Sequence, residues 1–150
     1  MIKVDLQTQE AIEYLVRELP VFMKHKAIQE GVGNAARIFE SLGRSNLSHS
    51  IMGHGKQTGE TMRSLMSRVS SARKRGAAPY SAAGFRRKIG WRAHLIDRGT
   101  VPRYTKKGAY RGFITPTYFY EKARIEGEKP AMDVIIDGVQ RAVARLSNRG

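Results

Sequence analysis

The sequence predicts an α+β fold in which a small antiparallel sheet packs against N-terminal and C-terminal helices, with long basic loops. Apolar residues recur with helical spacing near both ends of the chain, and between them lie short stretches that alternate apolar and polar side chains. With 150 residues and 41% hydrophobic content, residues 1–150 are expected to form a single domain with its own core. The chain has no cysteine, which excludes disulfides, thiolate metal sites and thiol nucleophiles.

The N-terminal part is predicted to begin with a strand and a first helix. Residues 1–6 alternate apolar and polar side chains, as a short strand does. Thr8 can cap a helix with one apolar stripe, and Pro20 ends or kinks that helix.

A second helix is predicted over residues 27–42, and Gly43 stands where a C-terminal cap is expected. Gly31 and Gly33 inside this pattern cost about 1 kcal/mol each relative to alanine. The helix is therefore either broken there or packed closely against a neighbour. Residues 44–57 are rich in Gly, Ser, His and Asn, and are expected to form a loop.

The middle of the chain mixes short elements with basic connections. Residues 58–66 predict a short amphipathic turn, and a strand can begin at Arg68. Residues 72–84 contain cations, small side chains, two glycines and a proline, which indicates a basic connection between elements.

Residues 85–93 alternate in character and predict a half-buried antiparallel strand with a cationic outer face. Phe85 and Trp91 fall on its apolar side, so we expect both in the core. Tyr104 and Tyr110 also stand among cations, where aromatic side chains can stack on nucleic-acid bases, and the pattern does not decide their place.

Three short segments are predicted next. Residues 94–100 indicate a helical turn or strand end that stops at Gly99. Residues 101–112 form a second basic loop, and residues 113–116 a short strand.

The C-terminal part predicts two helical pieces. A helix starting at Tyr118 is expected to be interrupted by Gly127, and Pro130 suits the first turn of a last helix. The apolar stripe of that last helix is expected in the core and consists of Met132, Ile135, Ile136, Val139, Val143 and Leu146.

Positive charge is concentrated in the middle of the chain. Between Arg63 and Arg111 there are fourteen basic residues and one acid, Asp97, whereas the whole chain has a formal net charge of +14. Such a concentration of like charge raises the free energy of the folded state through self-repulsion, and it is the electrostatic footprint of a nucleic-acid contact. The competing interpretation is a solvated face that keeps the protein soluble.

The sequence does not predict an enzyme, a cofactor or a metal site. The glycine-rich stretch Gly53–Gly59 lacks the spacing of a phosphate-binding loop, and the four histidines form no ligand motif. Asp97 is interpreted as a local charge partner of Arg98 or Arg92 rather than as a catalytic group. Neither a secretory signal nor a membrane span is expected, so the protein is interpreted as intracellular, or assembled there.

Three stretches, in this order, resemble a family of small tail-completion or neck proteins from tailed bacteriophages. The family's Thr-Gly-x-Leu-Arg-x-Ser-Ile-like signature is matched by Thr58-Gly59-Glu60-Thr61-Met62-Arg63-Ser64-Leu65. An apolar-apolar-acid-x-Gly-Thr element is matched by Leu95-Ile96-Asp97-Arg98-Gly99-Thr100, with Asp for the usual Glu. A Phe-x-x-Pro element that precedes the last helix is matched by Phe113-Ile114-Thr115-Pro116.

The resemblance implies a structural virion protein, assembled in the host cytoplasm, that forms a ring of six copies at the head–tail joint. Its partners would be copies of itself, neighbouring neck and tail-tube proteins, and the genomic DNA, with no membrane. Together with the charge pattern, it implies that one set of cations faces the DNA without reading its sequence: Arg73, Lys74, Arg75, Arg86, Arg87, Lys88, Arg103, Lys106, Lys107 and Arg111.

Two other functions fit the composition less well. A stand-alone basic RNA- or DNA-binding module, such as a ribosome-associated factor, would use the same cations but act as a monomer. A nuclease would need clustered acids to hold metal ions, and twelve of the thirteen acids lie outside the basic segment.

Overall fold

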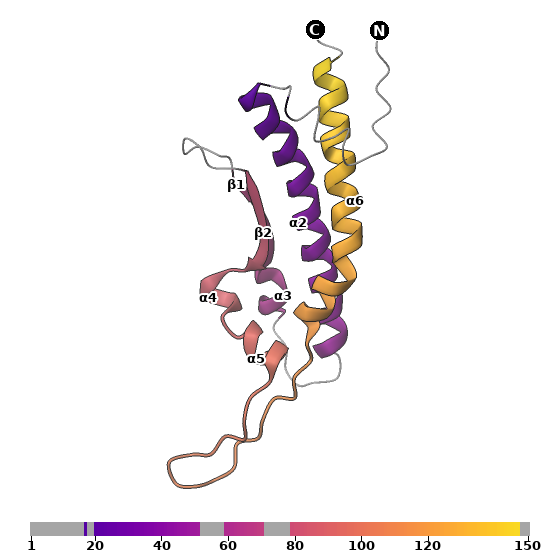
Figure 1. Ribbon diagram of the computed structural model, residues 1–150. Helices are drawn as coiled ribbons and strands as arrows, with labels where there is room; N and C mark the ends of the chain where they lie inside the picture. The colour runs from indigo at the N-terminus through magenta and orange to yellow at the C-terminus, as the bar shows by residue number, and fades with distance from the viewer. Residues whose placement is uncertain (1–16, 18–19, 52–58, 71–78, 148–150) are drawn as a thin grey trace. The chain divides into compact units, whose positions relative to one another are not determined.

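The fold is α+β, with a two-stranded antiparallel sheet packed with the N-terminal and C-terminal helices (Figure 1). The computed structural model describes Arg17 and residues 20–51, 59–70 and 79–147. The strand expected over residues 1–6 and most of the helix expected after Thr8 lie outside these residues. The described elements, in order, are α2 Val21–Ile51, α3 Glu60–Ser64, β1 Leu65–Ser70, β2 Tyr80–Phe85, α4 Arg87–Gly90, α5 Ala93–Arg98 and α6 Phe119–Ser147.

The chain divides into two compact units. Unit 1 consists of Met1–Ile38, Ser67–Ala82 and Lys129–Gly150, and unit 2 of Phe39–Met66 and Ala83–Glu128. Both long helices and both strands contribute residues to each unit. Every contact described below joins residues of the same unit.

The core of unit 1 is a close contact between α2 and α6. A Cβ atom added to Gly31 would lie 2.8 Å from the carbonyl oxygen of Ile135, and one added to Gly138 would lie 2.7 Å from the Cα of Gly31. The helices therefore touch through their backbones, and α2 is continuous rather than broken at Gly31. The buried side chains around this contact are small: Ala27, Ala35, Ala36, Ala131, Val139, Ala142 and Val143.

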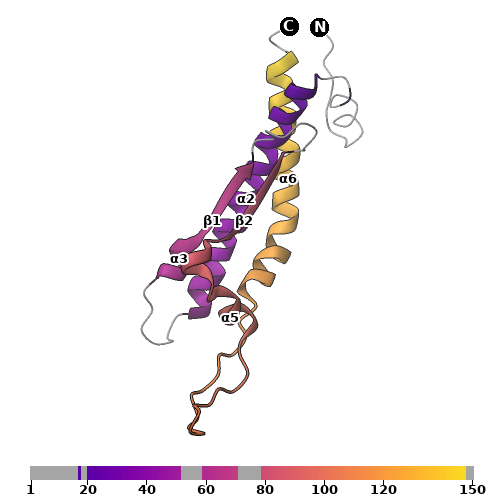
Figure 2. The same cartoon turned by 90° about the vertical axis from the view of Figure 1, so that its left-hand side faces the viewer.

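The sheet packs on α2 through a second close contact in unit 1. A Cβ on Gly33 would lie 2.9 Å from Cγ2 of Val69 in β1. The hydroxyl of Ser81 in β2 donates a hydrogen bond to the carbonyl oxygen of Val32, 2.5 Å away. Both strands therefore run beside α2 (Figure 2).

Unit 2 has a core of larger side chains. The fully buried Leu47 and Phe119 pack with Ala93, and the ring of Phe85 meets that of Phe119 edge-on, with centroids 5.9 Å apart. Such edge-to-face pairs stabilise a core beyond the area that they bury. The partly buried side chains around this cluster are Met62, Phe85, Ile96 and Tyr120.

Helix α2 is longer than the sequence predicted. It passes through Gly43 and ends at Ile51, so the expected helix end and the expected loop over residues 44–51 are wrong. Gly43 is buried because Leu65 approaches to within 2.9 Å of where its Cβ would be. Leu47, one turn later and fully buried, continues the apolar face.

Helix α6 is likewise one helix where two were expected. The predicted interruption at Gly127 and the predicted start at Pro130 are both wrong. Gly127 provides room for the ring of Phe39, whose Cε1 would be 2.7 Å from an added Cβ. Val139 and Val143 are buried as expected, Ile135 and Ile136 are half-buried, Met132 is 56% exposed, and the side chain of Leu146 is not described.

The strand expected over residues 85–93 is not formed. Strand β2 ends at Phe85, and α4 and the start of α5 follow. Gly90 is buried, and a Cβ there would lie 2.7 Å from the hydroxyl oxygen of Ser64, so the chain turns where alternation suggested a continuing strand. Phe85 is in the core as predicted, whereas Trp91 is 54% exposed.

The remaining boundaries differ in smaller ways. Strand β1 begins at Leu65, three residues before Arg68. Residues 94–100 were expected to form a helical turn or a strand end, and the structure has the helical turn, α5, after which Gly99 has a φ of 73°. Residues 113–116 do not form a strand, and Phe113 is 56% exposed.

Candidate assembly and DNA-contact surface

Asp97 caps the first turn of α6 from a distant part of the sequence. Its Oδ1 accepts the backbone N–H of Tyr120 at 2.9 Å, and its carbonyl oxygen accepts that of Tyr118 at 2.9 Å. The first N–H groups of a helix have no partner within the helix, and a carboxylate there also complements the helix dipole. Asp97 therefore has a structural partner other than Arg98 or Arg92, which corrects the sequence interpretation.

The residues after Asp97 close the base of a hairpin. A Cβ on Gly99 would lie 2.6 Å from the carbonyl oxygen of Ile114 and 2.8 Å from the ring of Pro116. Thr100 donates its N–H to the carbonyl oxygen of Ile114 and accepts the N–H of Ile114 on its hydroxyl, both at 2.9 Å. Two of the stretches that carry the family resemblance thus meet in space.

Residues 100–114, called the hairpin arm below, form an antiparallel hairpin where a basic loop was expected. The backbone N–H of Arg103 donates to the carbonyl oxygen of Gly112 at 3.0 Å. The backbone N–H of Arg111 donates to the carbonyl oxygen of Arg103 at 2.7 Å. Tyr104 and Tyr110 form an antiparallel bridge, and the turn beyond them contains Gly108 with a φ of 81°. Figure 1 shows the arm extending away from α5 and from the beginning of α6.

The hairpin arm exposes both apolar and cationic side chains. The rings of Tyr104 and Tyr110 lie side by side with centroids 5.5 Å apart, and both are more than half exposed. An apolar surface of this kind on a protein usually marks an interaction site. The arm has no acid, and its other large exposed side chains of these two kinds are Val101, Phe113, Arg103, Lys106, Lys107 and Arg111.

A second group of cations surrounds α4 and is called the α4 cluster. Arg86 precedes this short helix, and Arg87 and Lys88 form its first turn, all three exposed. The guanidinium of Arg92 lies 5.1 Å from the ring centroid of the exposed Trp91, within the range of a cation–π contact.

The ten cations expected to face DNA fall into three groups. The first, Arg73, Lys74 and Arg75, lies outside the described residues. The other seven are exposed and divide between the α4 cluster and the hairpin arm. Within the described part of the chain none of these seven forms an ion pair with a carboxylate, so their charge remains available for a partner.

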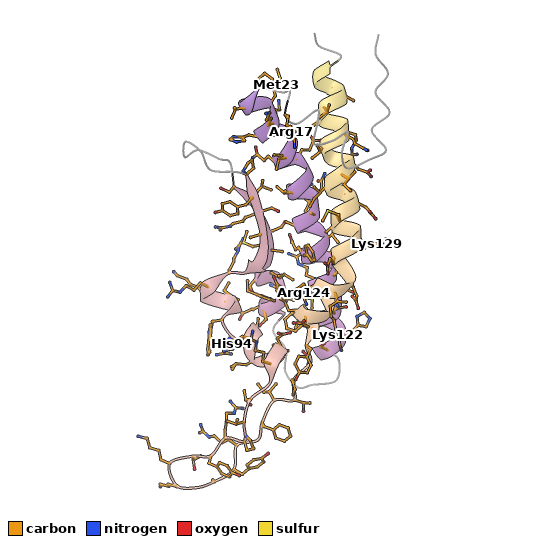
Figure 3. The ribbon with its side chains drawn as sticks, viewed as in Figure 1. Arg17, Met23, His94, Lys122, Arg124 and Lys129 are labelled. Atoms are coloured by element: carbon orange, nitrogen blue, oxygen red, sulfur yellow. The ribbon has the colours of Figure 1, made fainter. Side chains whose placement is uncertain are left out.

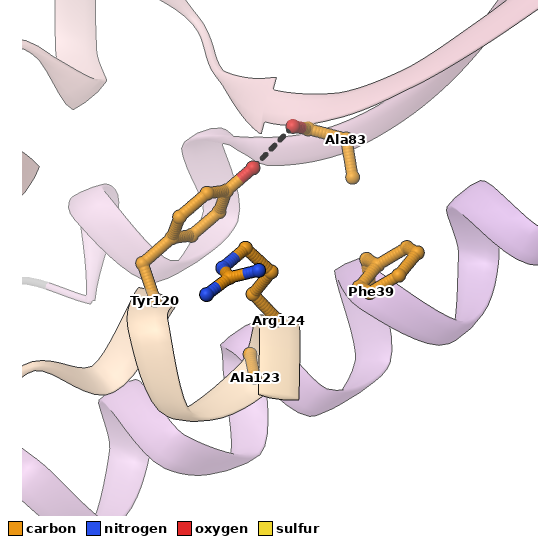
Figure 4. A pocket seen from close by; sticks show the side chains of 5 residues that line it. All are labelled: Phe39, Ala83, Tyr120, Ala123 and Arg124. Atoms are coloured by element: carbon orange, nitrogen blue, oxygen red, sulfur yellow. Dashed lines mark hydrogen bonds between the residues drawn. The ribbon is translucent and has the colours of Figure 1, made fainter. Parts of the chain in front are cut away.

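Unit 2 also contains an open pocket of about 220 Å³ that the sequence did not indicate. It is lined by Phe39, Ala83, Tyr120, Ala123 and Arg124 (Figure 4). No residue pattern brings α2, β2 and α6 together at this point; the only signal was the run of three aromatic residues at 118–120.

Two of the lining side chains have well-defined partners. The hydroxyl of Tyr120 donates to the carbonyl oxygen of Ala83 at 2.5 Å. Burial, and then the charge of Asp97, raises the pKa of Tyr120, so its hydroxyl remains a donor. Arg124, at the start of α6 (Figure 3), pairs with Glu121 at 3.0 Å, and this hydrogen bond and charge raise the pKa of Arg124.

The described residues include no group of three or more His, Asp or Glu side chains placed to hold a metal ion. Among the helices of that part of the chain, none is long and apolar enough to cross a membrane. Comparisons with protein-family models, with curated proteins and with solved structures found no match.

Proposed function

We propose that this protein is a structural component of a tailed-bacteriophage virion and forms a ring at the head–tail joint around the path of the DNA. The observation that supports the proposal most is the hairpin arm, whose tyrosines and cations are uncovered in the single chain. A two-stranded hairpin has no core of its own, so such a surface gains stability from another molecule. Neighbouring neck and tail-tube proteins would bind the two faces of the ring, and the resemblance suggests six copies.

The unpaired cations of the α4 cluster support contact with DNA by charge alone. Arg86, Arg87 and Lys88 stand on one short helix and its approach, where they can meet successive phosphates. Charge contacts with phosphates carry no sequence information, which suits a genome that must slide past the ring. In a stand-alone nucleic-acid-binding module, the alternative function, the same cluster would act on a monomer.

DNA titration tests the charge contact. Each phosphate contact contributes about −0.9 to the slope of log affinity against log salt concentration. Replacing Arg86, Arg87 and Lys88 together with glutamine should flatten that slope by up to about 2.7. The matched control, glutamine at Lys26, Arg37 and Arg141, removes three exposed cations elsewhere and should leave most of the slope. Equal slopes for the two variants would show that the α4 cluster does not contact the DNA.

Electron cryomicroscopy of virus particles that contain the protein tests the ring itself. The expected result is a closed ring of this chain between capsid and tail, with the α4 cluster lining the channel. A particle neck without this chain, or tight DNA binding by a protein that never associates with itself, would favour the stand-alone module.

A further inference from the structure

Trp91 is the only tryptophan of the chain, and it is 54% exposed. Tryptophan is on average a highly buried residue, because its indole ring has a large apolar surface. The guanidinium of Arg92 lies 5.1 Å from the ring centroid, which is the arrangement of a cation–π contact. This contact orients the ring, and more than half of the residue remains exposed beside it.

The backbone on both sides of Trp91 is held by hydrogen bonds. Before α4, the N–H of Arg86 donates to the carbonyl oxygen of Ser64, the last residue of α3, at 2.9 Å. After Trp91, the N–H of Leu95 donates to the carbonyl oxygen of Arg92 at 3.0 Å, at the start of α5. The exposed ring therefore stands on a hydrogen-bonded support, and a partner can bind it without first ordering the chain.

Positive charge is concentrated on the segment that carries the ring. Residues 85–96 contain four lysines and arginines and no acid, and these cations are all exposed: Arg86, Arg87, Lys88 and Arg92. Among the residues that the structure describes, none of the four pairs with a carboxylate. Helix α3 carries one acid, Glu60, and one cation, Arg63, whose charges offset each other. The next acid along the chain, Asp97, caps α6. The segment therefore favours an anionic partner.

We infer that the indole of Trp91 stacks on an unpaired base of single-stranded DNA, while the α4 cluster and Arg92 bind the phosphates beside that base. Aromatic side chains next to cations are the combination that binds single strands, and stacking tolerates any sequence because every base has a π face. The bases of a duplex are already stacked on each other, so duplex DNA keeps only the charge contact. The inference deepens the DNA contact proposed for the α4 cluster and rests on it, but it does not depend on a ring.

Other partners fit this surface less well. A carboxylate-rich protein would satisfy the cations but does not require a flat exposed ring among them. A membrane surface holds an amphipathic helix through a long apolar face, whereas α4 has four residues and exposes Ile89 as its one large apolar side chain. On the hairpin arm, Tyr104 and Tyr110 already have each other as ring partners.

Fluorescence of the wild-type protein tests the stacking directly, because emission from the single tryptophan reports on this site alone. Titration with a short oligothymidine should quench the emission of Trp91. An oligomer of the same length without bases has the same phosphates, and it should bind about fivefold more weakly or worse and cause no quenching. Equal affinity and equal quenching for the two oligomers would overturn the inference.

Substitutions at Trp91 separate stacking from a structural role, with affinities measured by anisotropy of labelled oligomers. Trp91→Ala should bind oligothymidine about fivefold more weakly or worse, and the base-free oligomer as the parent does. Trp91→Phe should keep most of the preference for bases because it keeps a ring, whereas Trp91→Leu should lose it. The control is Tyr80→Ala, which removes an aromatic residue that is 64% exposed on β2 and should bind like the parent. Circular dichroism melting checks that each variant is folded. Equal losses for both oligomers in Trp91→Ala would overturn the inference.

The competing partners give different outcomes. Loss of the base preference in Tyr104→Ala/Tyr110→Ala, with Trp91→Ala unaffected, would place the stacking on the hairpin arm. A shift of the Trp91 emission to shorter wavelength with phosphatidylglycerol vesicles, without quenching by oligothymidine, would assign the surface to a membrane. Either result would overturn the inference.

Failure of the stacking and failure of the proposed charge contact can be told apart. Salt-dependent binding of both oligomers with equal affinity would overturn the stacking alone and leave the charge contact standing. If glutamine at Arg86, Arg87 and Lys88 left the salt dependence unchanged while oligothymidine still quenched Trp91, the stacking would be supported and the charge contact of the α4 cluster would be wrong.

Discussion

The helix pair of unit 1 buries small side chains, whereas the hairpin arm of unit 2 exposes large ones. In unit 1 the buried residues of α2 and α6 are glycines, alanines and valines, and the backbones touch at Gly31. On the arm the large side chains of Tyr104 and Tyr110 are exposed. The first region is closed within one chain, because the backbones of the two helices leave no room for a side chain at Gly31. The second is incomplete, because its tyrosine rings stay more than half exposed among the residues that the structure describes.

The difference separates a region that is closed by its own backbone packing from one whose large side chains stay exposed. Close helix contact gives many dispersion contacts without long side chains, and so without much entropy loss. The arm depends on its base, where Asp97, Gly99 and Thr100 fix the two ends of the hairpin.

The largest effect is expected at the helix contact. Gly31→Val should lower the free energy of unfolding by about 3 kcal/mol, because the new side chain meets the backbone of Ile135, which cannot move aside cheaply. Gly84→Val is the matched control: nothing lies within 4 Å of a Cβ there, and valine suits a strand. Urea denaturation of both variants measures the difference. Equal stabilities would contradict a backbone-limited contact.

A smaller loss is expected at the base of the arm. Asp97→Ala removes the acceptor for the N–H of Tyr120 and should cost about 1 kcal/mol, as lost helix caps do. Asp97→Asn keeps an acceptor oxygen and should cost less. Denaturation gives the stabilities, and hydrogen exchange at the first turn of α6 should rise in the alanine variant. If alanine and asparagine cost the same, the charge rather than the hydrogen bond is what matters.

The hydroxyl of Tyr120 should contribute about 1 kcal/mol through its bond to Ala83, so Tyr120→Phe should lose that amount at neutral pH. The raised pKa means that the unfolded chain releases this proton first. The contribution is therefore complete below about pH 10, the ordinary tyrosine pKa, and falls as pH rises above it. The phenylalanine variant should lose less stability than the parent over that alkaline range, which denaturation at several pH values can measure.

The smallest effect on stability is expected on the arm. For Tyr104→Ser/Tyr110→Ser, the free energy of unfolding measured at a concentration where the parent is monomeric should change by no more than about 0.5 kcal/mol, as for most surface changes. A loss comparable to that of Gly31→Val would mean that the tyrosine pair supports the chain's own fold, and the contrast between the two regions would disappear.

Patterns along the sequence predicted the fold class, the approximate location of the helices and the exposure of the basic residues in the described middle of the chain. Helical spacing of apolar residues identified both α2 and the last part of α6, and Gly99 was identified as the end of a short element. These features are local, since they follow from the residues of one element and from the steric freedom of glycine. The ring, its place in a virion and its contact with DNA remain predictions.

The roles of the other glycines and the contacts between distant residues became visible only in the folded chain. Gly43 and Gly127 were expected to end or interrupt helices. Instead, Leu65 and Phe39 occupy the space where a side chain at each position would lie. Asp97 gained a partner 23 residues away, and the pocket gathered side chains from α2, β2 and α6. A glycine has the same local preferences in a cap and in a helix contact. What distinguishes the two is the neighbour that packs against it, which the order of residues along the chain does not specify.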